Sequence, residues 1–133
     1  MTDIPFGLST IGQILVPVRD AGRATAFYRD SLGLRFLFAF PHIAFFDTDG
    51  VRLFLSEPDA PGFEGRVTLY FRVPDIHAAV AALEERGVVF GDPPHLVHRD
   101  GPSELRMCAT HDPDGNNIVL MGEVPIIPPA SGS

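Results

Sequence analysis

The sequence predicts an α+β fold in which two tandem βαβββ modules form a curved mixed sheet or cup. The main observation is an internal repeat: a strand–helix stretch that starts at Gln13 returns at Thr68, and Val18-Arg19-Asp20 is matched by Val73-Pro74-Asp75 (73 − 18 = 55 residues later). A repeated strand–helix unit is best interpreted as two copies of one module. Three further segments with strand character follow each helix, so each module covers one sheet face with its helix and leaves the other face open.

The first module is expected over residues 11–57. An alternating, β-branched strand at 11–18 leads into a helix that Asp20 caps and Gly33 ends. Three further strands are expected, at 34–40, 42–48 and 51–57, and the Asp49-Gly50 pair is typical of the hairpin turn between the last two.

The second module is expected over residues 66–122, after a Pro- and Gly-rich linker at 58–65. Its first strand at 66–73 is followed by a helix that Asp75 caps and Gly87 ends. Its remaining strands are expected at 88–90, 103–111 and 116–121. Residues 123–133 lack periodicity and are interpreted as a flexible tail, so the whole chain, 1–133, forms a single domain.

Composition and charge exclude several classes of function. The formal net charge is −7 and no basic stripe is present, which argues against a nucleic-acid partner. No apolar run is long enough to span a membrane, and the N-terminus lacks a basic region followed by an apolar stretch. The single Cys108 allows no internal disulfide, which fits a reducing compartment. Together, these observations predict a cytoplasmic protein that binds neither nucleic acid nor a membrane.

Three strings of residues carry a resemblance to a known family. They are Val16-Pro17-Val18-Arg19-Asp20, then Ala26-Phe27-Tyr28-Arg29-Asp30 continuing through Leu32-Gly33-Leu34, and Asp112-Pro113-Asp114-Gly115-Asn116. Through them residues 11–122 resemble the vicinal oxygen chelate superfamily, which includes glyoxalase I, methylmalonyl-CoA epimerase, extradiol dioxygenases and bleomycin-resistance proteins. The resemblance implies a glyoxalase-like fold. It does not choose among lyase, isomerase, oxygenase and ligand-binding functions.

The resemblance also implies where a metal would bind. The four ligand positions of the superfamily fall here on Gln13, Phe54, Thr68 and Val119. Only Gln13 is a usual ligand, whereas Phe54 and Val119 cannot ligate. We therefore expect no metal and no cofactor, and keep a divalent metal at other ligands as the alternative. His95 and His98 have a spacing that can bind zinc, but they lie in a Pro-rich loop without a wider metal motif.

Alternation along the strands selects the side chains expected on the open face, because successive side chains of a strand point to opposite faces. The third strand is expected to present His42, Ala44 and Phe46 on the open face. The seventh strand is expected to present its polar side there, which consists of Glu104, Arg106, Cys108 and Thr110. The candidate substrate-binding residues are Gln13, His42, Arg52, Phe54, Tyr70, Arg72, Arg106, Val119 and Met121. Apolar side chains with a few convergent polar groups are typical of a small-molecule pocket. The three arginines either bind a carboxylate or phosphate or only form surface ion pairs.

These observations favour a protein that lacks the metal ligands of the superfamily and binds a small aromatic or anionic molecule in the cup, as bleomycin-resistance proteins hold their drug. One alternative is a lyase, isomerase or dioxygenase that acts through side chains or through a misplaced metal site. Another is a non-catalytic dimerising domain. The sequence does not decide whether the protein is an enzyme, and the catalytic residues stay unknown. By analogy with the superfamily, we expect a homodimer.

Overall fold

The computed structural model describes residues 6–57 and 66–125, and it confirms the predicted α+β fold of two βαβββ modules. The predicted linker at 58–65 and most of the predicted tail lie outside the described residues. The first module comprises β1 (Gln13–Pro17), α1 (Ala21–Ala26) with its π-helical continuation η1 (Phe27–Ser31), β2 (Arg35–Phe40), β3 (Ile43–Thr48) and β4 (Val51–Ser56). The second comprises β5 (Thr68–Arg72), α2 (Ile76–Glu85), β6 (His95–Asp100), β7 (Ser103–His111) and β8 (Asn117–Pro125).

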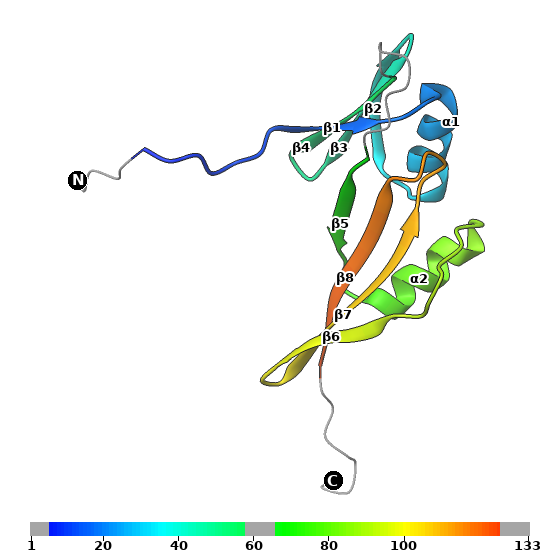
Figure 1. Ribbon diagram of the computed structural model, residues 1–133. Coiled ribbons are helices and arrows are strands. Elements are labelled where there is room, and N and C mark those ends of the chain that lie inside the picture. Colours follow the sequence, from blue (N-terminus) through cyan, green and yellow to red (C-terminus); the bar gives the residue numbers. More distant parts are fainter. Residues whose placement is uncertain (1–5, 58–65, 126–133) are drawn as a thin grey trace, which may run out of the picture.

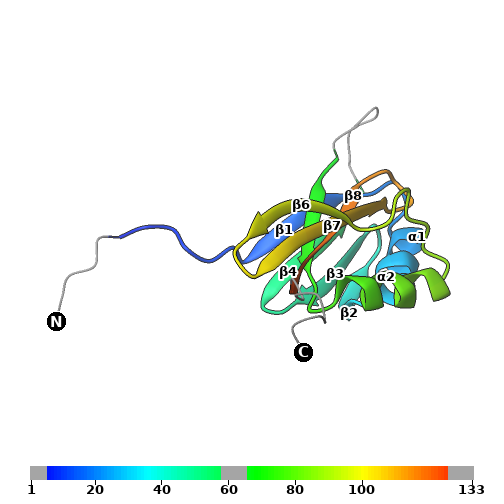
Figure 2. The same ribbon diagram turned by 90° about the horizontal axis from the view of Figure 1, so that it is seen from below.

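Each module forms its own four-stranded sheet, and the two sheets have the same topology. Their strand orders are β1-β4-β3-β2 and β5-β8-β7-β6, and in each sheet the first strand lies parallel to the last. Figure 1 shows the two sheets one above the other, and both helices lie on the same side of the molecule in Figures 1 and 2. The helix-covered faces therefore turn toward one region of the molecule, and the open sheet faces turn away from it.

Asp20 and Asp75 begin the two helices as the repeat predicts. The Asp20 carboxylate accepts a hydrogen bond from the Arg23 amide, and the Asp75 carboxylate accepts one from the Ala78 amide, both at 3.0 Å. Such side chains satisfy backbone N–H groups that a helix start leaves without a partner. Beneath α1, the buried core includes Val16, Leu53 and Leu55.

The string at residues 112–116 joins the modules rather than lining an open face. Tyr28, on η1, is fully buried, and its hydroxyl donates to Asp112 at 2.8 Å. The buried Asn116 amide donates to the Pro17 carbonyl at 2.8 Å and to Asp112 at 2.9 Å, and its oxygen accepts from the Val67 amide at 2.9 Å. Burial, followed by the nearby Asp112 charge, raises the pKa of Tyr28 far above its ordinary value.

Two strand predictions differ from the structure. Residues 88–90 form no strand, because the Val88 amide donates to the Leu83 carbonyl at the end of α2, and the sixth strand is β6 instead. β6 pairs with β7 only, at the sheet edge, and its sequence, HLVHRD, does not alternate between apolar and polar residues. β8 continues to Pro125, three residues into the predicted tail, because residues 122–125 still pair with β7.

Glu57 fixes the start of α1 and makes the stability of the first module depend on pH. Its carboxylate accepts a hydrogen bond from the Ala21 amide at 2.8 Å, and its other oxygen lies 2.8 Å from His42 Nδ1. The Ala21 amide first, and then His42, lower the pKa of Glu57 below its ordinary value of 4.5. A lowered folded-state pKa stabilises the fold above pH 4.5, and this contribution is lost as the pH falls through the folded-state pKa.

We therefore expect Glu57→Gln to lower the melting temperature at pH 7. The difference from wild type should shrink as the pH falls through the lowered folded-state pKa of Glu57, where the wild-type carboxylate becomes protonated. Melting curves recorded between pH 7 and pH 3 check this. Glu85→Gln, at an exposed position of α2, is the matched control and should follow the wild type at every pH. A Glu57→Gln difference that stays constant across the range would contradict the assignment.

Candidate functional site

The open face of the first sheet carries a cluster of aromatic rings, which we call the aromatic face and define as Phe38, Phe45, Phe54 and Arg52. Phe45 and Phe54 lie opposite each other on β3 and β4, and their rings stack with centroids 4.8 Å apart and planes 6° apart. Phe38 extends the cluster, with its centroid 4.7 Å from that of Phe45. The Arg52 guanidinium lies 5.4 Å from the Phe45 centroid and 5.6 Å from the Phe38 centroid, a distance typical of cation–π contact.

Gln13 and Leu15 border the aromatic face on the neighbouring strand. In the parallel pairing of β1 with β4, Gln13 lies beside Arg52 and Leu15 beside Phe54. Both side chains are exposed, whereas Ile14, between them, packs against the core under α1. The structure thus brings three predicted residues, Gln13, Arg52 and Phe54, onto one face.

The prediction for the third strand is wrong. Ala44 and Phe46 are fully buried under α1, where Phe46 lies 6.1 Å from Tyr28 between ring centroids, and Phe45 takes the open face instead. Both sides of this strand are apolar, so alternation cannot tell them apart, and pairing with the buried Leu53 and Leu55 of β4 decides.

His42 lies at the turn between β2 and β3 rather than on the sheet face. Its backbone has a φ of 71°, and its imidazole contacts Glu57 at the start of α1. A non-glycine residue at positive φ is typical of a tight turn. His42 therefore contacts Glu57 at the end of the sheet and does not belong to the aromatic face.

The open face of the second sheet carries four of the predicted residues. Tyr70 pairs with Val119, and Arg72 pairs with Met121, across β5 and β8. Val119 is buried, whereas the Tyr70 side chain is 59% exposed. Beside them, the Asn117 amide donates to the Thr68 hydroxyl at 3.1 Å.

Arg106 lies on the opposite face of this sheet, and its assignment to the open face is wrong. Its Nη1 lies 3.4 Å from His77 Nε2 on α2, and its Nη2 donates to Glu104 at 3.0 Å. Hydrogen bonds from Arg99 and then Arg106 lower the pKa of Glu104. The polar side of β7 thus pairs within the chain beneath α2, and the open face of β7 carries Met107 and Ala109.

The single cysteine, Cys108, lies on the same side of β7 as Arg106, the side that α2 covers. Cys108 is buried in the core under α2, and this burial, followed by the charge of Glu84, raises the pKa of its thiol. Because the thiolate is the nucleophilic form of cysteine, a raised pKa makes this side chain less reactive. Cys108 is a packing residue of the core.

The four positions implied for metal ligands do not fit a divalent cation. Gln13 and Phe54 lie on the open face of the first sheet, and Thr68 and Val119 on that of the second. Their donor set is one amide and one hydroxyl that already accepts a hydrogen bond from Asn117, without a carboxylate or imidazole. Among residues 6–57 and 66–125, no group of three or more His, Cys, Asp or Glu side chains is placed to hold a metal ion.

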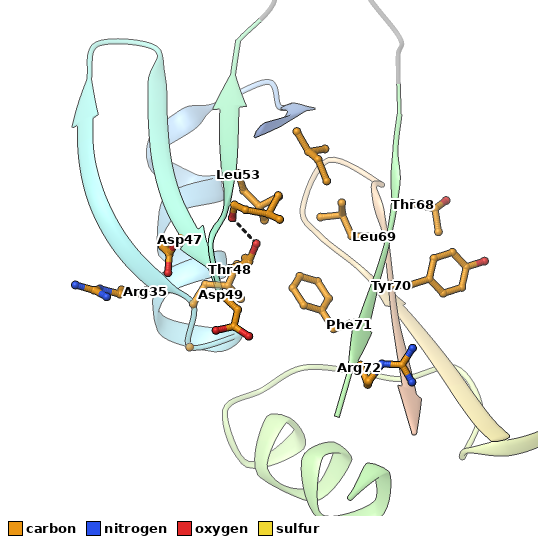
Figure 3. Close-up of a pocket in the computed structure, with 14 residues that line it drawn as sticks. Arg35, Asp47, Thr48, Asp49, Leu53, Thr68, Leu69, Tyr70, Phe71 and Arg72 are labelled. Carbon is orange, nitrogen blue, oxygen red and sulfur yellow. Dashed lines mark hydrogen bonds between the residues drawn. The ribbon is translucent and has the colours of Figure 1, made fainter. Parts of the chain in front are cut away.

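A cleft of about 640 Å³ separates the two modules, and we call it the intermodule cleft (Figure 3). Leu53 and Leu34 line it from the first module, and every residue of β5 lines it from the second. Charged residues, including Asp47, Asp49 and Arg72, also line it. Sequence patterns missed this cleft because it forms between segments of two modules, and no single strand signals it.

Fold and open faces together define a class: paired βαβββ proteins in which each sheet has one face covered by a helix and one face open. The family model described as the Glyoxalase/Bleomycin resistance protein/Dioxygenase superfamily matches residues 10–120. The chain belongs to this superfamily, as the strings at residues 16–34 and 112–116 suggested.

Solved structures agree with this assignment. A lactoylglutathione lyase from Agrobacterium tumefaciens is 22% identical over 87% of this chain and 95% of that chain, with a TM-score of 0.71. A virulence protein from Salmonella typhimurium is 20% identical over 90% and 100% of the two chains, with a TM-score of 0.72. A superfamily member from Sphaerobacter thermophilus is 25% identical over 86% and 98%, with a TM-score of 0.67. The first two likenesses show the fold alone. Among curated proteins, none matches the chain.

The helices of the described residues are short. None of them is long and apolar enough to cross a membrane.

Proposed function

We propose that this chain binds a small, planar aromatic molecule that carries an acidic group, and that the molecule lies on the aromatic face. The observation that carries the proposal is the stacked pair of Phe45 and Phe54 with the Arg52 guanidinium beside it. Aromatic side chains bind a planar ring through stacked or edge contacts. A guanidinium adds a two-pronged partner for a carboxylate or phosphate.

The surroundings of the aromatic face support this ligand class. Leu15 and Phe40 extend the apolar surface, and the Gln13 amide provides a neutral donor and acceptor at its edge. A contiguous exposed apolar patch on a protein surface marks an interaction site. No metal enters the proposal, because the four implied ligand positions lack the donors that a divalent cation needs.

Binding measurements with three sets of small molecules test the proposal. Aromatic carboxylates and phosphates are compared with neutral aromatics of the same size and with aliphatic acids of the same charge. We expect the aromatic acids to bind more tightly than either other set, because only they use both the rings and Arg52. Equal binding of aliphatic and aromatic acids would contradict a site built on stacked rings.

We also propose that two copies form a homodimer through their open faces. In one chain both open faces turn away from the helix-covered side and leave Leu15 and Tyr70 about half exposed. A second copy that covers the aromatic face with its own second sheet would turn an open surface into a concave site, the shape that small-molecule ligands require.

Leu15→Asp is expected to convert this dimer to monomers without unfolding it, because it places a charge on the covered face. Sedimentation velocity and circular dichroism check the two parts of this result. The matched control is Ala81→Asp, at an exposed position of α2, which should stay dimeric. A dimer that tolerates Leu15→Asp would contradict an interface on the open face.

A further inference from the structure

The two histidines that the sequence placed in a Pro-rich loop lie on a strand instead. His95 and His98 both belong to β6, at the edge of the second sheet beside β7 (Figure 1). Residues three apart on a regular strand point to opposite faces. β6 carries a bulge between the two histidines, because Leu96 and His98 lie opposite two consecutive residues of β7. The bulge therefore turns both imidazoles to the same face of the sheet.

That face is the open one, and it carries two methionines beside His95. His95 lies opposite Met107 on β7, and Met107 lies opposite Met121 on β8. His98 lies opposite Leu105, which shares the open face with Met107 because it is two residues away on β7. Cross-strand partners have Cβ atoms about 4.5–5.5 Å apart. Both histidines are exposed and both methionines are half-buried, so two imidazoles and two thioethers meet on one surface.

We propose that the open face of the second sheet holds a copper(I) site made by two imidazoles and two thioethers, those of His95, His98, Met107 and Met121. A thioether is a soft ligand that selects copper(I), and imidazole also suits copper. Zinc prefers thiolate, imidazole and carboxylate, and the hard cations prefer oxygen. Among residues 6–57 and 66–125, no third His, Cys, Asp or Glu joins the two histidines to hold a metal ion. Coordination therefore depends on the sulfur atoms, which favours copper(I).

The strand order lets all four side chains reach one ion. β7 lies between β6 and β8, so an ion above Met107 is approached by the imidazoles from one side and by Met121 from the other. Neighbouring strands are about 4.8 Å apart, and the methionine side chain is long and flexible. Glu123, opposite Leu105, adds a negative charge to this face, whereas Arg72 lies on β5, about 14 Å from β6 across three strand spacings.

This site is separate from the aromatic face and from the proposed homodimer. Its four side chains belong to the second module of one chain, whereas the aromatic face lies on the first module. None of them occupies one of the four ligand positions that the superfamily resemblance implies. The copper site can therefore be tested without an aromatic ligand.

A copper(I) titration tests the proposal in a chain that carries Cys108→Ala, because a thiolate is itself a strong copper(I) ligand. Copper is kept reduced with ascorbate and is shared with a coloured copper(I) chelator. We expect one copper(I) ion per chain. Met107→Leu keeps the size and apolar character of the side chain but removes the sulfur, so the copper(I) affinity should fall at least about tenfold. Weak zinc binding by the two imidazoles should stay the same in this variant.

Two further variants separate a built site from binding by any surface histidine. His95→Ala should lose at least as much copper(I) affinity as Met107→Leu, whereas His111→Ala, at an exposed position at the end of β7, should bind like the parent chain. X-ray absorption of the copper complex should show both nitrogen and sulfur neighbours. Circular dichroism checks that every variant is folded.

Three results would overturn the copper site. They are an unchanged copper(I) affinity in Met107→Leu, an equal loss in His111→Ala and His95→Ala, and a copper complex with nitrogen neighbours alone. Titration of the same variants with an aromatic acid keeps the two proposals apart. Met107→Leu should bind the acid like the parent chain, so loss of the copper site would leave the aromatic-acid proposal intact, and the reverse also holds.

Discussion

Replacing Asn116 with alanine is expected to lower the free energy of unfolding by about 3–5 kcal/mol, because its side chain makes three hydrogen bonds inside the molecule. The Pro17 carbonyl and the Val67 amide lose this partner, and the Asp112 carboxylate loses one of its donors while keeping the Tyr28 hydroxyl. Each buried group left unpaired costs about 1–3 kcal/mol. The Pro17 bond spans the two modules, so the loss weakens the joint between them.

Chemical denaturation of wild type and variant measures this effect, and the chain offers a control one residue away. Asn117 is exposed, and its side-chain amide donates a hydrogen bond to the Thr68 hydroxyl at 3.1 Å. Asn117→Ala should change the free energy of unfolding by less than about 1 kcal/mol. If the two variants lose the same stability, the buried network at residues 112–116 does not join the modules as described.

Replacing Arg52 with alanine is expected to weaken the binding of an aromatic acid by about 10- to 100-fold. A hydrogen bond to a charged group contributes about 1.5–3 kcal/mol, and about 1.4 kcal/mol corresponds to tenfold in affinity. Binding of a neutral aromatic molecule of the same shape should change much less, because it makes no ion pair. Isothermal titration with both ligands measures the two affinities.

Phe54→Leu tests the rings separately from the charge. It keeps an apolar side chain on β4 but removes the stacked partner of Phe45, so both the acid and the neutral aromatic should bind about three- to tenfold more weakly. Arg29→Ala is the control for charge, because Arg29 is exposed on η1 and pairs with its neighbour Asp30. Equal losses for Arg52→Ala and Arg29→Ala would show that net charge, rather than the aromatic face, attracts the acid.

The fold was predictable because its signals are local and occur twice. Asp20 and Asp75 start the helices at matching points of the repeat, and each capping bond is present. β6 was missed because it is an edge strand without apolar alternation, and its place depends on pairing with β7. A local sequence pattern does not show which strands pair with each other.

The site was predictable where one side of a strand is polar and the other side lies under a helix. Arg52 and Phe54 of β4 meet this condition, since the apolar Leu53 and Leu55 mark the buried side. Phe45 and Phe46 do not, because both sides of β3 are apolar. Arg106 was misplaced for a different reason: its charge is paired with Glu104 beneath α2, so polarity did not mark the open face.

The most direct test of the aromatic-acid site is a titration of protein that has been treated with EDTA and whose metal content is measured in the same sample. We expect saturable binding of an aromatic acid, one molecule per chain, in protein without a stoichiometric metal, and weaker binding by Arg52→Ala. One metal ion per chain that is required for binding and is lost in Gln13→Ala would contradict this account and would place a metal centre on the open faces.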